Sequence, residues 1–98
     1  MGRASRQRPS HLAEKLLEIR TKLELSQNGI IRRMGLENDL AREEVSAFER
    51  GIRVPPLPVL LKYSRVAGIC LDVLVDDEMD LPEKLPSKPK HKRAERKN

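Results

Sequence analysis

The chain has 98 residues, of which 38% are hydrophobic and 36% are charged, so it has room for one small domain with a modest core. No apolar run approaches the roughly 20 residues of a membrane span, and we expect no membrane partner. With no tryptophan, one phenylalanine and one tyrosine, the composition argues against an aromatic ligand cage or a base-stacking platform.

The net charge of +5 is concentrated in the two ends of the chain. Residues 10–76 are close to neutral and form the expected domain. Residues 77–98, acidic at first and then rich in lysine, arginine and proline, are predicted to be a disordered tail. Residues 1–9 are predicted to be a flexible basic arm, because they contain three arginines and no acid: Arg3, Arg6 and Arg8. Long-range attraction to a nucleic acid should therefore depend on the ends.

The cysteine and histidine content argues against redox and metal chemistry. Cys70 is the single cysteine and is expected to cap or pack, and with no secretory signal it favours a cytoplasmic, reducing location. His11 and His91 are far apart and have no Cys or His neighbours, so no metal site is expected. No nucleophile with its base, no phosphate-binding glycine loop and no acid/base carboxylate pair is present. We expect no catalytic residue, no cofactor and no small-molecule substrate.

The first helix is predicted to begin at Ser10 as its N-cap and to run for about four turns. Its apolar residues recur at i, i+4, i+7 and i+11, the spacing of one helix face: Leu12, Leu16, Ile19 and Leu23. Three charged residues are expected on the outer face: Lys15, Glu18 and Lys22.

Two short helices are predicted next, with a turn at residues 37–39 between them. Ser26 is the expected N-cap of the second helix and Gly35 its end. The third helix is predicted over about residues 39–50, capped by Asn38 or Asp39 and ended by Gly51. Its inward residues should be Ala41, Val45 and Phe48.

A fourth helix should begin among Pro55, Pro56 and Pro58, because only the first helical turn tolerates proline without losing hydrogen bonds. Its apolar side is expected to contain Leu57, Leu60, Leu61 and Ala67, and Gly68 should end it. Cys70 is then the cap of a short fifth helix with three apolar residues: Leu71, Leu74 and Val75. The sequence thus predicts an all-α domain of five helices.

Residues 26–51 have the layout of a helix-turn-helix, which places one helix in the DNA major groove. Several short motifs in the same order and spacing resemble the Cro and lambda-repressor type of regulator, the xenobiotic-response-element family, over about residues 12–76. They are Ser26-Gln27, Gly35, Val45, Phe48-Glu49-Arg50-Gly51, Pro55, Leu57-x-x-Leu60-Leu61 and Gly68-Ile69-Cys70-Leu71-Asp72. The resemblance implies a compact five-helix lambda-repressor-like domain that binds operator DNA, usually as a homodimer.

Two features depart from the family pattern. About four extra residues stand near 36–39, between the second and third helices. The usual Ser or Thr cap of the third helix is replaced by Ala41 when the sequence is aligned back from Gly51. Either Asn38 or Asp39 caps a longer helix, or the turn is rebuilt.

The resemblance places the base-contacting residues between Arg42 and Ala47. Arg42 can donate two hydrogen bonds to guanine, Glu43 can accept from cytosine N4, and Ala47 can touch a thymine methyl group. Ser46 lies on the same face of the helix. The alternative is a solvated charged face, and Glu43 and Glu44 also suit a helix N-terminus for purely structural reasons.

Phosphate contacts are expected from three residues around this helix: Gln27, Arg50 and Arg53. Gln27 lies in the first turn of the second helix, where backbone N–H groups also face an anion, although a local cap with Ser26 is an alternative. Family resemblance pairs Arg20 with Glu49 as a structural ion pair. Arg32 and Arg33 lie outside the apolar side of the second helix and are expected to contribute little.

Together these features predict a DNA-binding transcriptional regulator, with a repressor as the expected form. Its partners would be double-stranded DNA and a second copy, paired through the C-terminal helix region at Leu71, Leu74 and Val75. The alternative is a protein-interaction module of the same fold, such as an antitoxin or regulatory partner. An enzyme is not expected.

Overall fold

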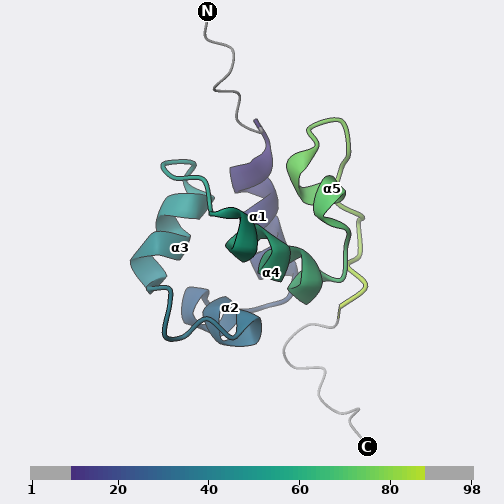
Figure 1. Cartoon of the computed structure of the whole chain (residues 1–98). Coiled ribbons are helices and arrows are strands. Elements are labelled where there is room, and N and C mark those ends of the chain that lie inside the picture. The colour runs from purple at the N-terminus through teal and green to yellow at the C-terminus, as the bar shows by residue number, and fades with distance from the viewer. Residues whose placement is uncertain (1–9, 88–98) are drawn as a thin grey trace, which may run out of the picture.

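Five helices follow one another along residues 10–87, the part of the chain that the computed structural model describes (Figure 1). They are α1 (Leu12–Lys22), α2 (Gln27–Met34), α3 (Arg42–Glu49), α4 (Leu57–Ala67) and α5 (Leu71–Val75). No strand is present in this range, so the expected all-α architecture is confirmed. The basic arm with Arg3, Arg6 and Arg8, and His91 with the end of the tail, lie outside the described residues. No helix within residues 10–87 combines the length and the apolar character that crossing a membrane requires.

The core lies between α1 and the other helices. α1 packs against α3 and α5, α2 packs against α3 and α4, and α4 packs against α5. Leu16 and Ile19 of α1 are completely buried, as the helical spacing predicts. Residues from every helix join them, including Ile30, Val45, Phe48, Tyr63 and Leu74.

Three of the helix ends follow from local chemistry. The Ser26 hydroxyl accepts a hydrogen bond of 2.9 Å from the Gly29 N–H, which satisfies one of the free donors at the start of α2. Gly35 and Gly68 end α2 and α4 with φ angles of +74° and +80°, a conformation that glycine adopts without a steric penalty. The predictions for these ends are confirmed.

The start of α1 differs from the prediction. His11, not Ser10, is the N-cap residue, and neither side chain caps the helix. Instead the Asp77 carboxylate accepts hydrogen bonds from the backbone N–H groups of Ser10 at 2.7 Å and His11 at 3.0 Å. These bonds favour the ionised carboxylate and lower the pKa of Asp77. The capping acceptor therefore comes from the far end of the described chain.

The start of α3 also differs, because the helix is shorter than predicted. It begins at Arg42 with Ala41 as N-cap, and neither Asn38 nor Asp39 caps it. Residues 37–39 form a separate turn, in which the Asp39 and Leu40 N–H groups donate to the Leu36 carbonyl at 2.9 Å. Ala41 is exposed, not inward, and Leu36 and Leu40 pack against the core instead.

Lys15 was expected on the outer face of α1 but is only 5% exposed. Its ammonium donates to the carbonyl oxygens of Val73 at 2.7 Å, Asp76 at 2.9 Å and Met79 at 2.7 Å. A buried charge requires such partners, and here they come from the end of α5 and the segment after it.

The segment 77–87 was assigned to a disordered tail, whereas the structure packs it against the helices. Leu85 is buried and Leu81 packs against the core. The Ser87 N–H donates to the Ala67 carbonyl at 3.3 Å, and the Lys22 ammonium donates to the carbonyl of Glu83 at 2.7 Å. The ordered domain therefore continues past residue 76.

The apolar assignments on α4 and α5 were correct in part. Leu60 and Ala67 are buried, but Leu57 and Leu61 are 65% and 37% exposed and lie on the outer side of α4. Leu74 is completely buried in the core and so has no surface to offer a second copy. Leu71 and Val75, the other two residues of the expected dimer surface, are half-buried.

Candidate nucleic-acid interface

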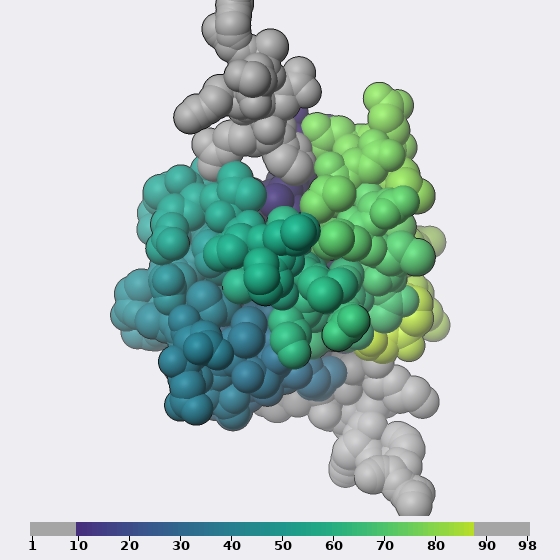
Figure 2. Space-filling model, viewed as in Figure 1, coloured from purple at the N-terminus to yellow at the C-terminus, as the bar shows by residue number. Residues whose placement is uncertain are grey.

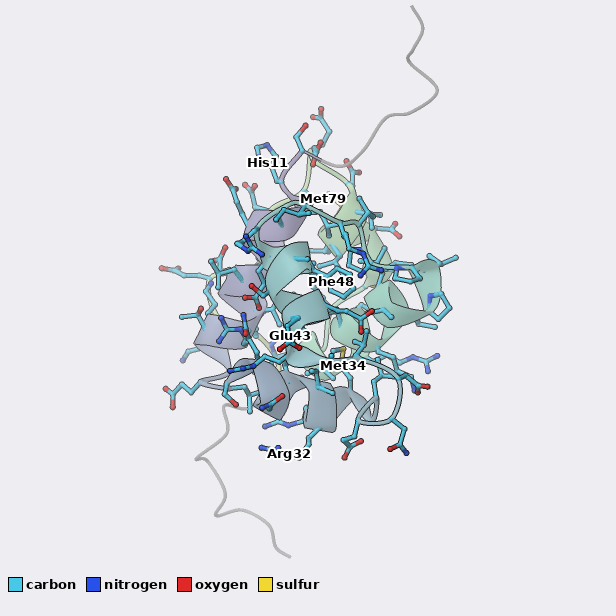
Figure 3. All side chains as sticks on the ribbon, turned by 90° about the vertical axis from the view of Figure 1, so that its left-hand side faces the viewer. His11, Arg32, Met34, Glu43, Phe48 and Met79 are labelled. Atoms are coloured by element: carbon cyan, nitrogen blue, oxygen red, sulfur yellow. The ribbon has the colours of Figure 1, made fainter. Side chains whose placement is uncertain are left out.

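The outer face of α3 contains the four residues expected to contact bases. Figure 3, turned so that α3 faces the viewer, shows Glu43 on this helix and Arg32 below it at the edge of α2. The side chains of Arg42 and Glu43 are 60% and 80% exposed, and their charged groups approach to 4.0 Å. Ser46 and Ala47 are half-buried and lie one turn further along the same face. The opposite face, with Val45 and Phe48, lies in the core.

Two arginines lie at the C-terminal end of α3 and in the connector after it. The Arg50 Nε donates to the Ser46 hydroxyl at 3.3 Å. The Arg53 guanidinium lies 3.5 Å from the Glu44 carboxylate and 5.8 Å from the centre of the Phe48 ring. Both arginines are exposed and flank the outer face of α3. Each of them also has a partner within the chain.

Glu44, the second carboxylate at the start of α3, has a structural role. Its Oε1 accepts a hydrogen bond of 2.9 Å from the Ala41 N–H. In a capping box this is the bond from the N-cap N–H to the side chain of the third helical residue. The other half is missing, because the alanine side chain has no oxygen to offer the Glu44 N–H. Glu44 is therefore engaged by Ala41 and Arg53, and Glu43 is the carboxylate that points to solvent at this end of the helix.

A hydrogen-bonded network around Glu49 fixes α1, α2 and α3 relative to one another. The expected ion pair is present: Arg20 Nε lies 2.6 Å from Glu49 Oε2, and Arg20 Nη2 donates to Glu49 Oε1 at 3.0 Å. Arg20 Nη1 also donates to the Leu25 carbonyl at 3.1 Å, at the entry to α2. The hydrogen bond to Glu49 raises the pKa of Arg20.

Gln27 belongs to this network. Its Nε2 donates to Glu49 Oε1 at 3.2 Å, and its side chain is half-buried. The sequence indicated a phosphate contact for Gln27 and did not indicate this internal partner. The spacing of 22 residues to Glu49 gives no local signal for such a bond.

Tyr63 of α4 lies in the core near the same network. Its side chain is completely buried, and its hydroxyl has no hydrogen-bond partner among residues 10–87. Burial raises the pKa of Tyr63, and the nearby Glu49 carboxylate raises it further, while Arg20 acts in the opposite direction.

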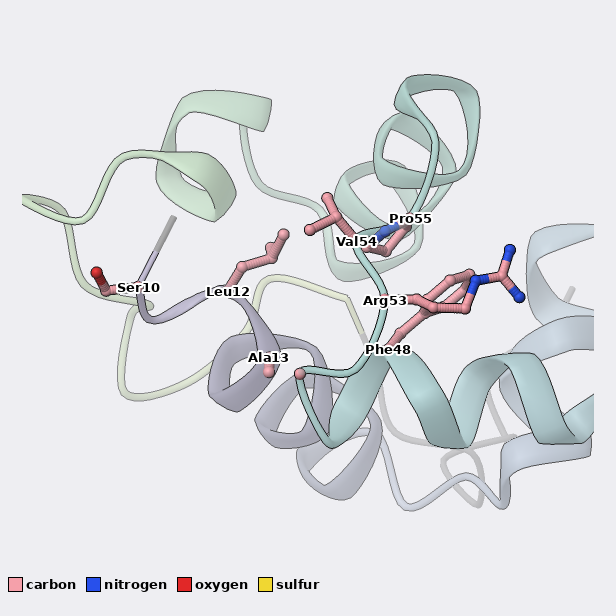
Figure 4. Close-up of a pocket in the computed structure, with 8 residues that line it drawn as sticks. Ser10, Leu12, Ala13, Phe48, Arg53, Val54 and Pro55 are labelled. Carbon is pink, nitrogen blue, oxygen red and sulfur yellow. The ribbon is translucent and has the colours of Figure 1, made fainter. Parts of the chain in front are cut away.

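The hollows on the described surface contain little reactive chemistry. Figure 4 shows a pocket of about 300 Å³ between the start of α1 and the connector after α3, where Leu12, Phe48 and Val54 form apolar walls. Arg53 is its one ionisable lining residue. Within residues 10–87, no three His, Cys, Asp or Glu side chains are grouped so as to hold a metal ion. Cys70 is exposed and occupies the N-cap position of α5.

Comparison with protein-family models, with curated proteins and with solved structures finds no match to this chain.

Proposed function

We propose that the chain is a sequence-specific DNA-binding regulator with a Cro- and lambda-repressor-like domain, in which α3 enters the major groove. The observation that supports this most strongly is the outer face of α3. It presents Arg42, Glu43, Ser46 and Ala47 to solvent, while the Arg20–Glu49–Gln27 network holds the helix in place from behind. A recognition helix needs both an open face and a fixed angle.

Each residue on this face suits a different base edge. Arg42 would donate to guanine O6 and N7, Glu43 would accept from cytosine N4, and Ala47 would touch a thymine methyl group. The Ser46 hydroxyl would hydrogen-bond a base once the Arg50 guanidinium leaves it to bind a phosphate. Glu44 would not repel the DNA strongly, because Ala41 and Arg53 already engage its carboxylate.

Phosphate contacts would come from Arg50 and Arg53 on one side of α3 and from the start of α2 on the other. Since the Gln27 amide is bound to Glu49, the backbone N–H groups at the start of α2 are the more direct donors to a phosphate. Repression and pairing of two copies through Leu71 and Val75 are part of the same proposal. A homodimer would place two α3 helices on adjacent turns of an operator.

The test is a selection from a random-site DNA pool, followed by anisotropy titrations at two salt concentrations. Arg42→Ala removes the guanine donor, and Arg65→Ala on α4 is the matched control because it removes the same charge away from α3. We expect an enriched sequence and a loss of about 1–3 kcal/mol at one base position in Arg42→Ala. Arg65→Ala should change all sequences equally or not at all.

Sequence-blind binding that collapses at the higher salt, with both variants behaving alike, would reject base recognition by α3. The result would favour the alternative, a protein-interaction module of the same fold. The ion pairing of Arg42 with Glu43 and of Arg53 with Glu44 is the observation on the side of that alternative, since it reduces the free positive charge of this face.

A further inference from the structure

Exposed large apolar side chains are concentrated around the start of α4. Among residues 10–87, six large hydrophobic side chains are exposed, and four of them lie within one stretch of ten residues: Ile52 (58%), Val54 (41%), Leu57 (65%) and Leu61 (37%). Single exposed apolar residues are ordinary, whereas a group on one surface marks a site for a partner. Val54 lines the hollow beside Leu12 and Phe48, so the group on α4 itself is Leu57 and Leu61.

The start of α4 holds this apolar group rigidly. Leu57 is the first helical residue and stands between Pro56, the N-cap, and Pro58. Proline fixes its own φ angle, so the two prolines limit the backbone freedom of this first turn. Leu61 follows one turn later on the same side of the helix. A preorganised apolar surface loses little entropy when a partner binds.

The outer face of α4 becomes cationic toward its C-terminal end. Lys62 and Arg65 are exposed there, and Arg33 of α2 joins them at a hollow of about 350 Å³ with Met34 and Val66 in its lining. Figure 2 shows α4 across the middle of the molecular face in view. One helix face is thus apolar in its first half and basic in its second.

The three cations at this hollow have no carboxylate partner among the described residues. Arg20, Lys22, Arg42 and Arg53 are all ion-paired there, but no ion pair joins Arg33, Lys62 or Arg65. Unpaired cations in a group produce a positive potential that attracts anionic groups.

We propose that the outer face of α4 is the docking surface for an acidic amphipathic protein segment. Apolar side chains of the segment would cover Leu57 and Leu61, and its carboxylates would reach Arg33, Lys62 and Arg65. The apolar half favours protein over nucleic acid, because phosphates and sugars have no counterpart for two exposed leucines. This site is separate from the face of α3, so it goes beyond DNA binding and does not depend on it.

The test is a selection of displayed random peptides against the full chain, with the Leu57→Ser variant as counter-selection. Leu57 is mostly exposed, so this change should leave the fold intact, and Leu61→Gln serves as the second variant. We expect the enriched peptides to combine apolar and acidic residues and to bind each variant at least about tenfold more weakly, an effect of about 1.4 kcal/mol. The matched control is Leu17→Ser on α1, a leucine that is 42% exposed and should be neutral.

Reversing the charges of the basic half of α4 tests whether the peptides bind through their carboxylates. Lys62→Glu with Arg65→Glu should abolish binding of the acidic peptides, while Lys84→Glu, an exposed lysine elsewhere, should not. Arg42→Ala should leave peptide binding unchanged, which separates this proposal from DNA recognition by α3.

The proposal would be overturned by the absence of any enriched peptide, by enriched peptides without acidic residues, by binding that ignores both Leu57 and Arg65, or by displacement of the peptides by duplex DNA. Displacement would reassign the face to nucleic acid. Self-association of the full chain in sedimentation, lost in Leu57→Ser, would equally overturn it and would make a second copy the occupant.

Discussion

Lys15 is bound as a metal cation would be, by carbonyl oxygens alone. An ammonium has three N–H donors and no acceptor. In Lys15 the three donors are matched by three acceptors, the carbonyl oxygens of Val73, Asp76 and Met79. Hydrogen bonds with a charged donor are stronger than neutral ones, and burial at 5% exposure keeps water from competing. A single side chain thus anchors the end of α5 and the loop after it to α1.

We predict that Lys15→Met lowers the free energy of unfolding by about 2–4 kcal/mol, because the apolar stem is kept while three carbonyls lose a charged donor. Urea denaturation measures the loss. Lys22→Met is the matched control: Lys22 also donates to carbonyls, those of Pro82 and Glu83, but its side chain is 27% exposed and can exchange these partners for water. It should cost less than about 1 kcal/mol. Equal losses in the two variants would contradict the cation-like role of Lys15.

Tyr63 illustrates the opposite situation, a buried polar group with nothing to bind. Tyr63→Phe should leave the free energy of unfolding unchanged or raise it by about 1 kcal/mol, because it removes an unsatisfied hydroxyl and keeps the ring. Thermal unfolding at neutral pH measures the difference. A loss greater than about 1 kcal/mol would mean that the hydroxyl has a bound partner, such as an ordered water.

Tyr63 also predicts an alkaline transition. Its pKa is raised above the ordinary value of 10.0, so above pH 10 the unfolded state releases a proton that the folded state retains. Stability is then present below this pH and decreases as pH rises. Since the chain has one tyrosine and no tryptophan, tyrosinate absorbance should appear together with unfolding and not before it. The variant Tyr63→Phe should lack this contribution to the pH dependence. Tyrosinate forming in the folded state would contradict the prediction.

The N-terminus of α3 has half of a capping box. Its N-cap residue has the extended backbone of a good cap, with φ −104° and ψ 157°, but alanine provides no acceptor. Glu44 supplies only the reciprocal bond to the Ala41 N–H. The Glu44 N–H donates to the Ala41 carbonyl at 2.9 Å, so this helix of eight residues begins with a backbone bond where a side-chain acceptor would be a further partner.

We predict that Ala41→Ser completes the capping box and raises the free energy of unfolding by about 0.5–1.5 kcal/mol. Ala41→Val, which adds bulk without an oxygen, should give no gain and serves as the control. Guanidinium denaturation of the two variants measures the change in the free energy of unfolding. If serine and valine have the same effect, the cap is not limiting for α3.

The sequence predicts a helix end correctly when the residues that cap it lie within a few positions of that end. Ser26, Gly35 and Gly68 act on their own helix ends within a few residues, and all three were assigned correctly. The sequence also shows extra residues before α3. Whether they lengthen the helix or rebuild the turn depends on the packing of Leu36 and Leu40 against the core, which no local pattern encodes.

The same distinction applies to the candidate site. The ion pair of Arg20 with Glu49 was anticipated from family resemblance, whereas the bond from Gln27 to Glu49 was not. Lys15 was misassigned because helical spacing places a lysine next to buried leucines without indicating carbonyl partners 58 to 64 residues away. Leu57 was misassigned because hydrophobicity alone does not show that the first residue of α4 lies outside the contacts of the helix, where it is 65% exposed.

At the scale of the whole molecule, the chain closes on itself through residues 77–87. Asp77 caps the start of α1, Lys22 binds the carbonyls of Pro82 and Glu83, and Leu85 is buried against the helices. Gly68 also lies against this segment, where an added Cβ would approach the Ser87 hydroxyl to 2.9 Å. The five helices therefore depend on a segment without regular structure.

We predict that a chain ending at residue 76 is several kcal/mol less stable than one ending at residue 87. Burial of Leu85 alone contributes about 2 kcal/mol, and the loss of the Met79 carbonyl as one of the three acceptors of Lys15 adds to it. Such a loss is a large fraction of the stability of a small domain. Thermal unfolding of the two chains side by side is the measurement. Equal melting temperatures would show that the segment contributes nothing.

The position of Lys15 has a consequence for how this domain could move between genes. A recombination crossover just after α5 would transfer all five helices and leave behind Met79, whose carbonyl is one of the three acceptors of the Lys15 ammonium, together with Asp77. The recipient would inherit a lysine buried beside leucines with part of its coordination missing. The five helices and the segment after α5 therefore have to be inherited together if the coordination of Lys15 is to stay complete.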